Sequence, residues 1–154
     1  MLFRSKEEQG YLNILVANSG IADGNNIKPH EYSDIKDVQD ALWNKAGTPE
    51  DFNRTLEVNV TAVYYTIVAF LELLDAGNKR RASPDHPTSQ AVITGSIGGF
   101  RRDETVGICS YGVSKAAVHH LGKIFTSYLR PFHIRVNVIA PGIYPSGIRF
   151  LEIQ

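Results

Sequence analysis

A tyrosine and a lysine stand four residues apart in the segment S-Y-G-V-S-K, as Tyr111 and Lys115. On a helix, side chains at this spacing share one face and lie about one turn apart. A positive charge held beside a phenol favours its ionised form, which brings the group closer to what a general acid or base needs near neutral pH. The alternative is an ordinary pair of surface side chains, and the surrounding sequence has to decide between the two.

A serine and an asparagine elsewhere in the chain suit the same chemistry. Ser96 ends the apolar run QAVITGS at 90–96, where its hydroxyl is placed to hydrogen-bond an oxygen on which negative charge develops. Asn59 interrupts an apolar helical pattern, and a buried amide at such a position needs a hydrogen-bond partner. A purely structural hydrogen bond is one explanation of Asn59, and a role at a reactive site is the other.

Three short runs rich in branched apolar residues predict strands that are buried on both faces. They are LNILVA at 12–17, the run at 90–96 already described, and IRVNVIA at 134–140. Charged and proline-containing sequence precedes the second run, and Pro131 precedes the third. Each run is short enough for a strand of ordinary length.

Three segments between these runs have helical patterning. A weak pattern covers about 34–44, a long one begins at Thr48 and Pro49 and stops near Gly77, and a third covers 111–129. Threonine suits an N-cap and proline suits the first helical position. Strands that alternate with long helices predict an α/β fold with a parallel sheet.

The predicted strands end in Asn18-Ser19-Gly20, in Gly95-Ser96 and in Pro141-Gly142. In a parallel α/β sheet the carboxyl ends of the strands share one rim, and ligands bind in the crevice beyond it. We therefore expect a site at this rim. Asn18 and Gly20 first of all shape their turn, and Pro141-Gly142 is also readable as a simple strand terminator.

The bulk composition excludes several classes of function. The chain has 154 residues with 16 basic and 16 acidic side chains, so its formal net charge is zero, and we expect no nucleic-acid partner. Its single cysteine, Cys109, allows no intramolecular disulfide. No apolar run has the length of a membrane span, and the N-terminus lacks the apolar core of a secretory signal, so we expect no membrane partner and a cytoplasmic location. We expect no metal site, because the adjacent His119 and His120 point in different directions on a helix.

Five motifs of the chain, taken in order, resemble those of the short-chain dehydrogenase/reductase family. They are A-N-S-G at 17–20, E-V-N-V at 57–60, the strand end at Ser96, Y-G-V-S-K at 111–115 and N-V-I-A-P-G at 137–142. The Y-x-x-x-K pattern alone would be weak, but the five motifs occur in the family's order, and the resemblance extends from about residue 11 to about residue 148. It implies a Rossmann-like doubly wound parallel sheet. The family's Gly-rich phosphate-binding turn is absent, so we expect a single partial domain over 1–154 that represents only the second, catalytic half.

The resemblance also implies roles for individual residues. Tyr111 would be the general acid/base, Ser96 would position the substrate, and Asn59 would hold a water molecule in a proton relay. Lys115 would assist Tyr111 and bind the nicotinamide ribose. Ser96 lies further from Tyr111 than is usual in the family, so the loop 100–107 is expected to carry an insertion. The residues implied at the cofactor are Asn18, Gly20, Tyr111, Lys115, Pro141, Gly142, Ile143 and Ser146.

The activity implied is an NAD(P)-dependent oxidation and reduction between a secondary alcohol and a carbonyl. Residues that select NAD or NADP are absent, so either cofactor is expected. The segments YGVSKAAVHHLGKIF and HIRVNVIAPGIYPSGI are similar to those of 3-oxoacyl thioester reductases, including the type linked to rhamnolipid precursors. The implied partners are a small carbonyl or alcohol substrate and further copies of the chain in a homo-oligomer. The alternative is a catalytically inactive family member that acts only as an interaction or assembly module.

Overall fold

The computed structural model describes residues 7–103 and 108–142. Within them, the strands β1 (Ile14–Ala17), β2 (Gln90–Thr94) and β3 (Arg135–Ile139) form one sheet in the order β1-β2-β3. Both neighbouring pairs are parallel, with Ala17 opposite Ile93 and Ile93 opposite Val138. The predicted α/β fold with a parallel sheet is confirmed, and the three strands lie where the apolar runs placed them.

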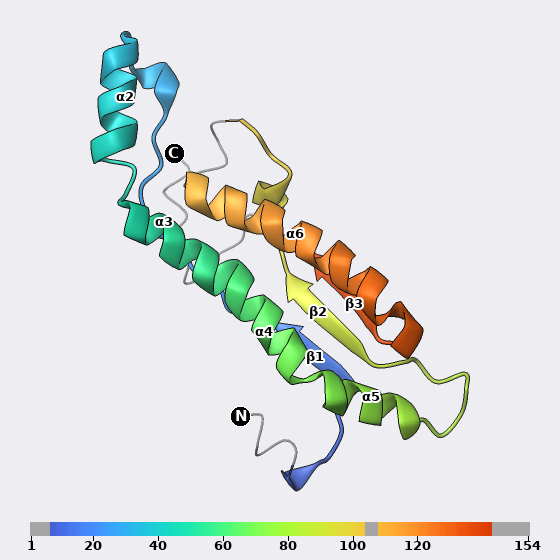
Figure 1. The fold of residues 1–154 in the computed structure, drawn as a ribbon. Helices are drawn as coiled ribbons and strands as arrows, with labels where there is room; N and C mark the ends of the chain where they lie inside the picture. The colour runs from blue at the N-terminus through green and yellow to red at the C-terminus, as the bar shows by residue number, and fades with distance from the viewer. Residues whose placement is uncertain (1–6, 104–107, 143–154) are drawn as a thin grey trace.

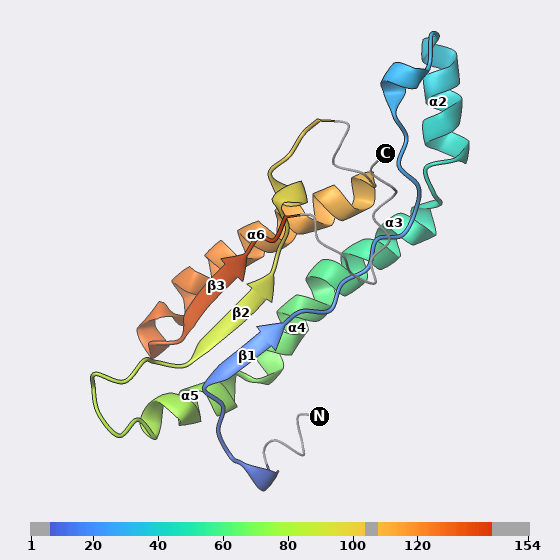
Figure 2. The ribbon, with the colours of Figure 1, turned by 180° about the vertical axis from the view of Figure 1, so that it is seen from behind.

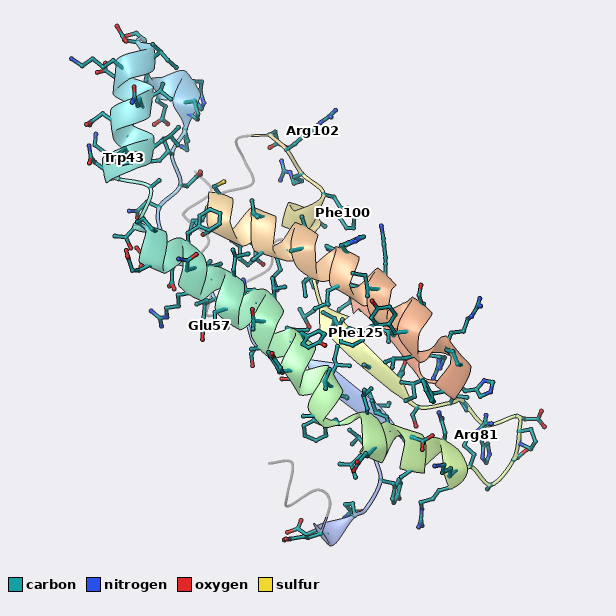
Figure 3. All side chains as sticks on the ribbon, in the orientation of Figure 1. Trp43, Glu57, Arg81, Phe100, Arg102 and Phe125 are labelled. Atoms are coloured by element: carbon teal, nitrogen blue, oxygen red, sulfur yellow. The ribbon has the colours of Figure 1, made fainter. Side chains whose placement is uncertain are left out.

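Helices connect the strands and also extend beyond the sheet. In chain order the elements between the strands are η1 (Pro29–Glu31), α2 (Ile35–Asn44), α3 (Pro49–Leu56), η2 (Glu57–Thr61), α4 (Ala62–Ala69), α5 (Leu71–Lys79), η3 (Ile97–Gly99), α6 (Cys109–Leu129) and η5 (Arg130–Phe132). In Figure 1 the strands point toward the beginning of α6, and α2 projects beyond that end of the sheet. Figure 3 labels Trp43 on this helix.

The predicted start of the long helix is confirmed. Thr48 is the N-cap of α3, with its Oγ1 accepting a hydrogen bond from Asp51 N at 3.1 Å. The carboxylate of Asp51 accepts in return from Thr48 N at 2.9 Å, which completes a capping box. The hydrogen bonds that the Asp51 carboxylate accepts, first from the Thr48 main chain and then from the Thr48 hydroxyl at 3.0 Å, lower the pKa of Asp51 below its usual value.

The sequence predicts one continuous helix to about Gly77, and the structure divides this segment. At η2 the helix widens into a π-turn, in which Ala62 N–H donates to Glu57 O, five residues back. At Phe70 the backbone leaves helical values, with φ −101° and ψ 5°, and α5 turns away by 44° from Pro49–Ala69. No single helix in the described residues is long and apolar enough to cross a membrane, although this bent pair passes a test of length and composition alone.

The helices cover one face of the sheet. Figures 1 and 2 show α4, α5 and α6 on the same side of the three strands, with the strands in front when the molecule is seen from behind. The opposite face is exposed: Ile14, Val16 and Ile139 are 53%, 56% and 49% accessible. The expectation of strands buried on both faces is therefore wrong for the described residues, because no helix among them packs on that second face.

The hydrophobic core lies between the covered face and the helices. Alternate strand residues point into it, as the two-residue period of a strand requires. The buried cluster comprises Ala17, Val63, Ile67, Leu74, Ala91, Ile93, Val118, Phe125, Leu129, Ile134 and Val136. This packing of α4 and α6 against the sheet fixes where the carboxyl ends of the strands stand relative to the start of α6.

Candidate active site

Tyr111 and Lys115 lie side by side in the first two turns of α6. The helix begins at Cys109, which places Tyr111 in its first turn and Lys115 one turn later. Both side chains are buried, at 7% and 3% accessibility, and Lys115 Nζ lies 5.6 Å from the centroid of the Tyr111 ring. These are not surface side chains, so the phenol stands beside a fixed ammonium group.

The ammonium group of Lys115 reaches the end of β2. Its Nζ donates a hydrogen bond of 2.7 Å to the main-chain oxygen of Thr94, the last residue of that strand. Burial lowers the pKa of Lys115 from its usual value, because a low-dielectric surrounding disfavours the charged form. The main-chain oxygen of Thr94 is a partner that side-chain types in the sequence do not reveal.

Ser96 stands at the same rim. It is the N-cap of η3, it is 7% accessible, and its Oγ accepts a hydrogen bond of 3.1 Å from Gly98 N. A Cβ atom added to Gly98 would lie 3.3 Å from Ser96 Oγ and 3.6 Å from Tyr111 Cε1. The serine hydroxyl and the tyrosine ring therefore flank the same glycine.

Asn59 links the turn after β1 to α6. It lies in the π-turn η2 and is 1% accessible. Its Oδ1 accepts from Ile21 N at 2.9 Å, and its Nδ2 donates to Ile21 O at 2.8 Å and to Ser114 Oγ at 2.9 Å. Both amide hydrogens are used in this way, so the side chain makes the structural hydrogen bonds that one explanation required. A water relay at Asn59 stays a prediction.

Ser114 is a site residue that the sequence analysis missed. Its Oγ donates a hydrogen bond of 2.7 Å to Tyr111 O and accepts one from Asn59, so it couples the π-turn to the helix that carries the tyrosine. Its position inside Y-G-V-S-K was the available signal. The hydroxyl of a serine within a helix often bonds a carbonyl of the preceding turn, and here it is also buried at 0% accessibility.

Gly20 closes the site from the side of β1. A Cβ atom at Gly20 would lie 3.3 Å from Asn59 Oδ1 and 3.5 Å from Lys115 Nζ, so this glycine leaves open the space in front of the ammonium group. Asn18 lies nearer the strand end, where its Oδ1 accepts a hydrogen bond of 2.9 Å from Thr94 Oγ1. Both residues stand at the rim, and Asn18 is exposed.

The end of β3 completes the rim. Pro141 O accepts a hydrogen bond of 3.0 Å from Ile97 N, which continues the pairing of β2 and β3 beyond both strands. Gly142 follows and is exposed. The other two predicted cofactor-binding residues, Ile143 and Ser146, lie outside the residues that the structure describes.

The fold and the rim define the class of protein. The parallel sheet ends at a serine and at a tyrosine–lysine pair on the following helix, and the family model "short chain dehydrogenase" matches residues 1–149. The chain belongs to the short-chain dehydrogenase family.

Individual relatives and structures are similar over most of this chain. A short-chain dehydrogenase/reductase, SAT3 of Stachybotrys chartarum, is 39% identical over 156 residues, which cover 94% of this chain and 56% of the relative. The rhamnolipids biosynthesis 3-oxoacyl-[acyl-carrier-protein] reductase of Pseudomonas aeruginosa is 35% identical and covers 70% of this chain and 43% of the relative. The solved Pseudomonas aeruginosa RhlG/NADP active-site complex has a TM-score of 0.68 at 30% identity, over 95% of this chain and 48% of that one. The chain thus spans about half the length of the proteins it matches.

Proposed function

We propose that this chain carries the proton-transfer machinery of an NAD(P)-dependent oxidoreductase that interconverts a carbonyl and a secondary alcohol. The observation that supports this most is the burial of Lys115 with its Nζ 5.6 Å from the Tyr111 ring, at the rim where Ser96 also stands. A structural pair would not need an ammonium group held out of water, since burying a charge costs free energy.

The proton would pass through Tyr111. In the direction of reduction, its hydroxyl gives its proton to the carbonyl oxygen of the substrate, and the positive charge of Lys115 stabilises the phenolate that is left. Ser96 Oγ donates a hydrogen bond to the same oxygen as charge develops on it. In the direction of oxidation, the phenolate takes the proton of the alcohol.

The residues present fit a nicotinamide cofactor. Gly20 leaves space in front of Lys115, and the ammonium group, which has three N–H donors, uses one on Thr94 in the described part of the chain. Its remaining donors suit ribose hydroxyls, and Asn18, Pro141 and Gly142 stand at the same rim. A bound NAD or NADP supplies or accepts the hydride. The RhlG structure that this chain resembles is an NADP complex, which supports a nicotinamide cofactor without selecting between the two.

For the substrate we propose a 3-oxoacyl thioester. The support is the similarity to the 3-oxoacyl-[acyl-carrier-protein] reductase of Pseudomonas aeruginosa, at 35% identity. A ketone that is β to a thioester presents one carbonyl oxygen for Tyr111 and Ser96 and a long polar remainder for binding elsewhere.

A non-catalytic assembly module is the second candidate, and exposed apolar side chains support it. Tyr64, Tyr65 and Val113 are 41%, 64% and 46% accessible on α4 and α6. Surfaces of this kind mark association sites more often than chance.

One experiment separates the two candidates. We expect reduced nicotinamide cofactor to bind the chain, detected by its fluorescence, and a 3-oxoacyl thioester to be reduced. Tyr111→Phe should keep cofactor binding and lower kcat by about 10²- to 10⁴-fold, the usual contribution of a general acid. Tyr128→Phe, at an exposed tyrosine of the same helix, is the matched control and should leave kcat unchanged. Absence of cofactor binding at millimolar concentration would reject the catalytic candidate and leave the assembly module.

A further inference from the structure

Ser96 lies in an extended segment that continues β2 and pairs with the chain after β3. Gly95 N donates to Ile139 O at 2.8 Å, and Ile97 N donates to Pro141 O at 3.0 Å. Because successive residues of an extended chain direct their main-chain polar groups to opposite sides, the N–H and C=O of Ser96 point away from β3. They need partners on the side of β1.

β1 cannot supply those partners, since it ends at Ala17. Side chains of α6 reach this edge instead. Lys115 Nζ donates to Thr94 O at 2.7 Å. One turn further along α6, His119 Nε2 lies 2.9 Å from Ser96 O, to which it donates when it carries a proton, and 3.3 Å from Ser96 N, from which it accepts when it carries none.

The two contacts cross, because α6 runs opposite to β2 (Figure 1). The main chain of Lys115 lies beside Gly99, where an added Cβ atom would be 2.7 Å from Lys115 C, and the ring of His119 lies beside Gly95. The long side chain of Lys115 reaches back to Thr94 O, whereas His119 contacts Ser96 O from close by. A lysine and a histidine of α6 thus line the edge of β2 beyond the end of β1.

The local sequence is built around this imidazole. His119 is 8% accessible, and its ring lies against the Phe100 ring with a centroid separation of 4.2 Å. Figure 3 labels Phe100 beside α6. A Cβ atom at Gly95 would lie 2.6 Å from His119 Cε1, and one at Gly99 would lie 2.8 Å from His119 Cδ2. Only glycine leaves room for the ring at these two positions, so the loop that carries Ser96 closes directly on His119.

We propose that His119 is a positioning residue for Ser96, with its Nε2–H donating to the main-chain oxygen of that serine. Holding the main chain of Ser96 in place also holds its hydroxyl in the position where Oγ accepts the hydrogen bond from Gly98 N. The strength of that bond therefore measures how well the hydroxyl is positioned. The catalytic consequence of this inference rests on the proposed function, whereas the structural contact stands without it.

Nuclear magnetic resonance of the full chain tests the contact directly. The ¹⁵N shifts of His119 should show a single form with a proton fixed on Nε2. In His119→Leu the amide of Gly98 should exchange with solvent at least about tenfold faster than in wild type, since its acceptor is no longer held. His119→Gln, whose amide can donate to Ser96 O, should restore slow exchange, and His120→Leu, at the exposed neighbouring histidine, should leave it unchanged.

Two results would overturn the proposal. One is an unchanged Gly98 exchange rate in folded His119→Leu. The other is a wild-type His119 whose ¹⁵N shifts show the proton exchanging between its two ring nitrogens, a result that decides the matter even where His119→Leu does not fold.

Catalysis gives a separate measurement. His119→Leu should lower kcat by about ten- to a hundredfold with little change in KM, because a small displacement of a positioned group has effects of this size. The loss should not add to that of Ser96→Ala, since both act through one hydroxyl; full additivity counts against the proposal. If wild type shows no activity, the proposed function fails, and the exchange rates and ¹⁵N shifts still decide the role of His119.

Discussion

At the scale of single residues, the buried charge of Lys115 distinguishes this site from an ordinary helix surface. The side chain is 3% accessible, and in residues 7–103 and 108–142 its hydrogen-bond partner is a main-chain oxygen, not a carboxylate. A neutral partner compensates the lost hydration of an ammonium group only in part. The folded state therefore bears a free-energy cost for as long as Lys115 is charged.

This cost predicts a pH dependence of stability. Burial lowers the pKa of Lys115 from 10.5, so between the folded and unfolded pKa values the unfolded chain holds more protons than the folded one. Stability then rises with pH in that window. We expect the free energy of unfolding of wild type, minus that of Lys115→Met, to increase from pH 7 to pH 10 in denaturant titrations.

Lys123→Met, at an exposed lysine of the same helix, corrects for the loss of a surface positive charge. A difference between wild type and Lys115→Met that stays constant over this pH range would show that the folded chain does not resist charging of this lysine.

At the scale of elements, the segment that the sequence predicts as one helix from Pro49 to about Gly77 comprises α3, η2, α4 and α5 in the structure. Its start is set locally, by the capping box of Thr48 and Asp51. Its π-turn is set from outside, because Asn59 turns inward to bond Ile21 and Ser114. The helix thus has a strong beginning and a widened middle that delivers a polar side chain to the site.

The capping box gives a prediction for this element. Thr48→Ala removes the acceptor of Asp51 N and should lower the free energy of unfolding by about 1 kcal/mol, the usual effect of losing an N-cap. Thr48→Ser keeps a hydroxyl and should lose only a fraction of this. Urea denaturation followed by circular dichroism measures both, and equal losses in the two variants would contradict a capping role.

Acid should weaken the capping box of Thr48 and Asp51. Hydrogen bonds from Thr48 lower the pKa of Asp51, so the contribution of this carboxylate is present above its unfolded pKa and is lost as pH falls through the folded value. The stability gap between wild type and Thr48→Ala should therefore narrow in acid.

The sequence predicts local features of this fold well and remote ones poorly. The cap at Thr48, the strand positions and the shared face of Tyr111 and Lys115 follow from spacing within a few residues. The contact of His119 with the main chain of Ser96 does not, because its partner is a backbone atom that every residue type carries. The sequence does not predict the π-turn at Asn59 for a similar reason. The helix widens there because Asn59 bonds the main chain of Ile21, which is distant in the sequence.

At the scale of the whole molecule, the described residues bury one face of the sheet and expose the other. Ile14, Val16 and Ile139 lie on the exposed face, and their branched side chains resemble those of a strand that is covered on both sides. Composition could not predict this asymmetry, because burial depends on which elements pack on each face.

The exposed face predicts dye binding and self-association of the chain. The double variant Val16→Thr/Ile139→Thr keeps β-branched side chains and removes apolar surface. We expect it to bind less of the dye 1-anilinonaphthalene-8-sulfonate and to sediment more nearly as a monomer than wild type does. Ile35→Thr removes an even more exposed apolar side chain from α2, away from the sheet, and should leave both properties unchanged. An equal effect in this control would mean that the exposed face of the sheet has no special part in association.

The long connection between β1 and β2 also affects when the candidate site can form during folding. Ser96, Tyr111 and Lys115 lie together on the stretch from β2 to β3, whereas Gly20 follows β1, whose partner strand begins only at Gln90. Closing so long a loop loses chain entropy that grows with the logarithm of its length. The part of the candidate site that Gly20 borders therefore forms only when the first strand docks, and a small molecule bound there would stabilise the docked state.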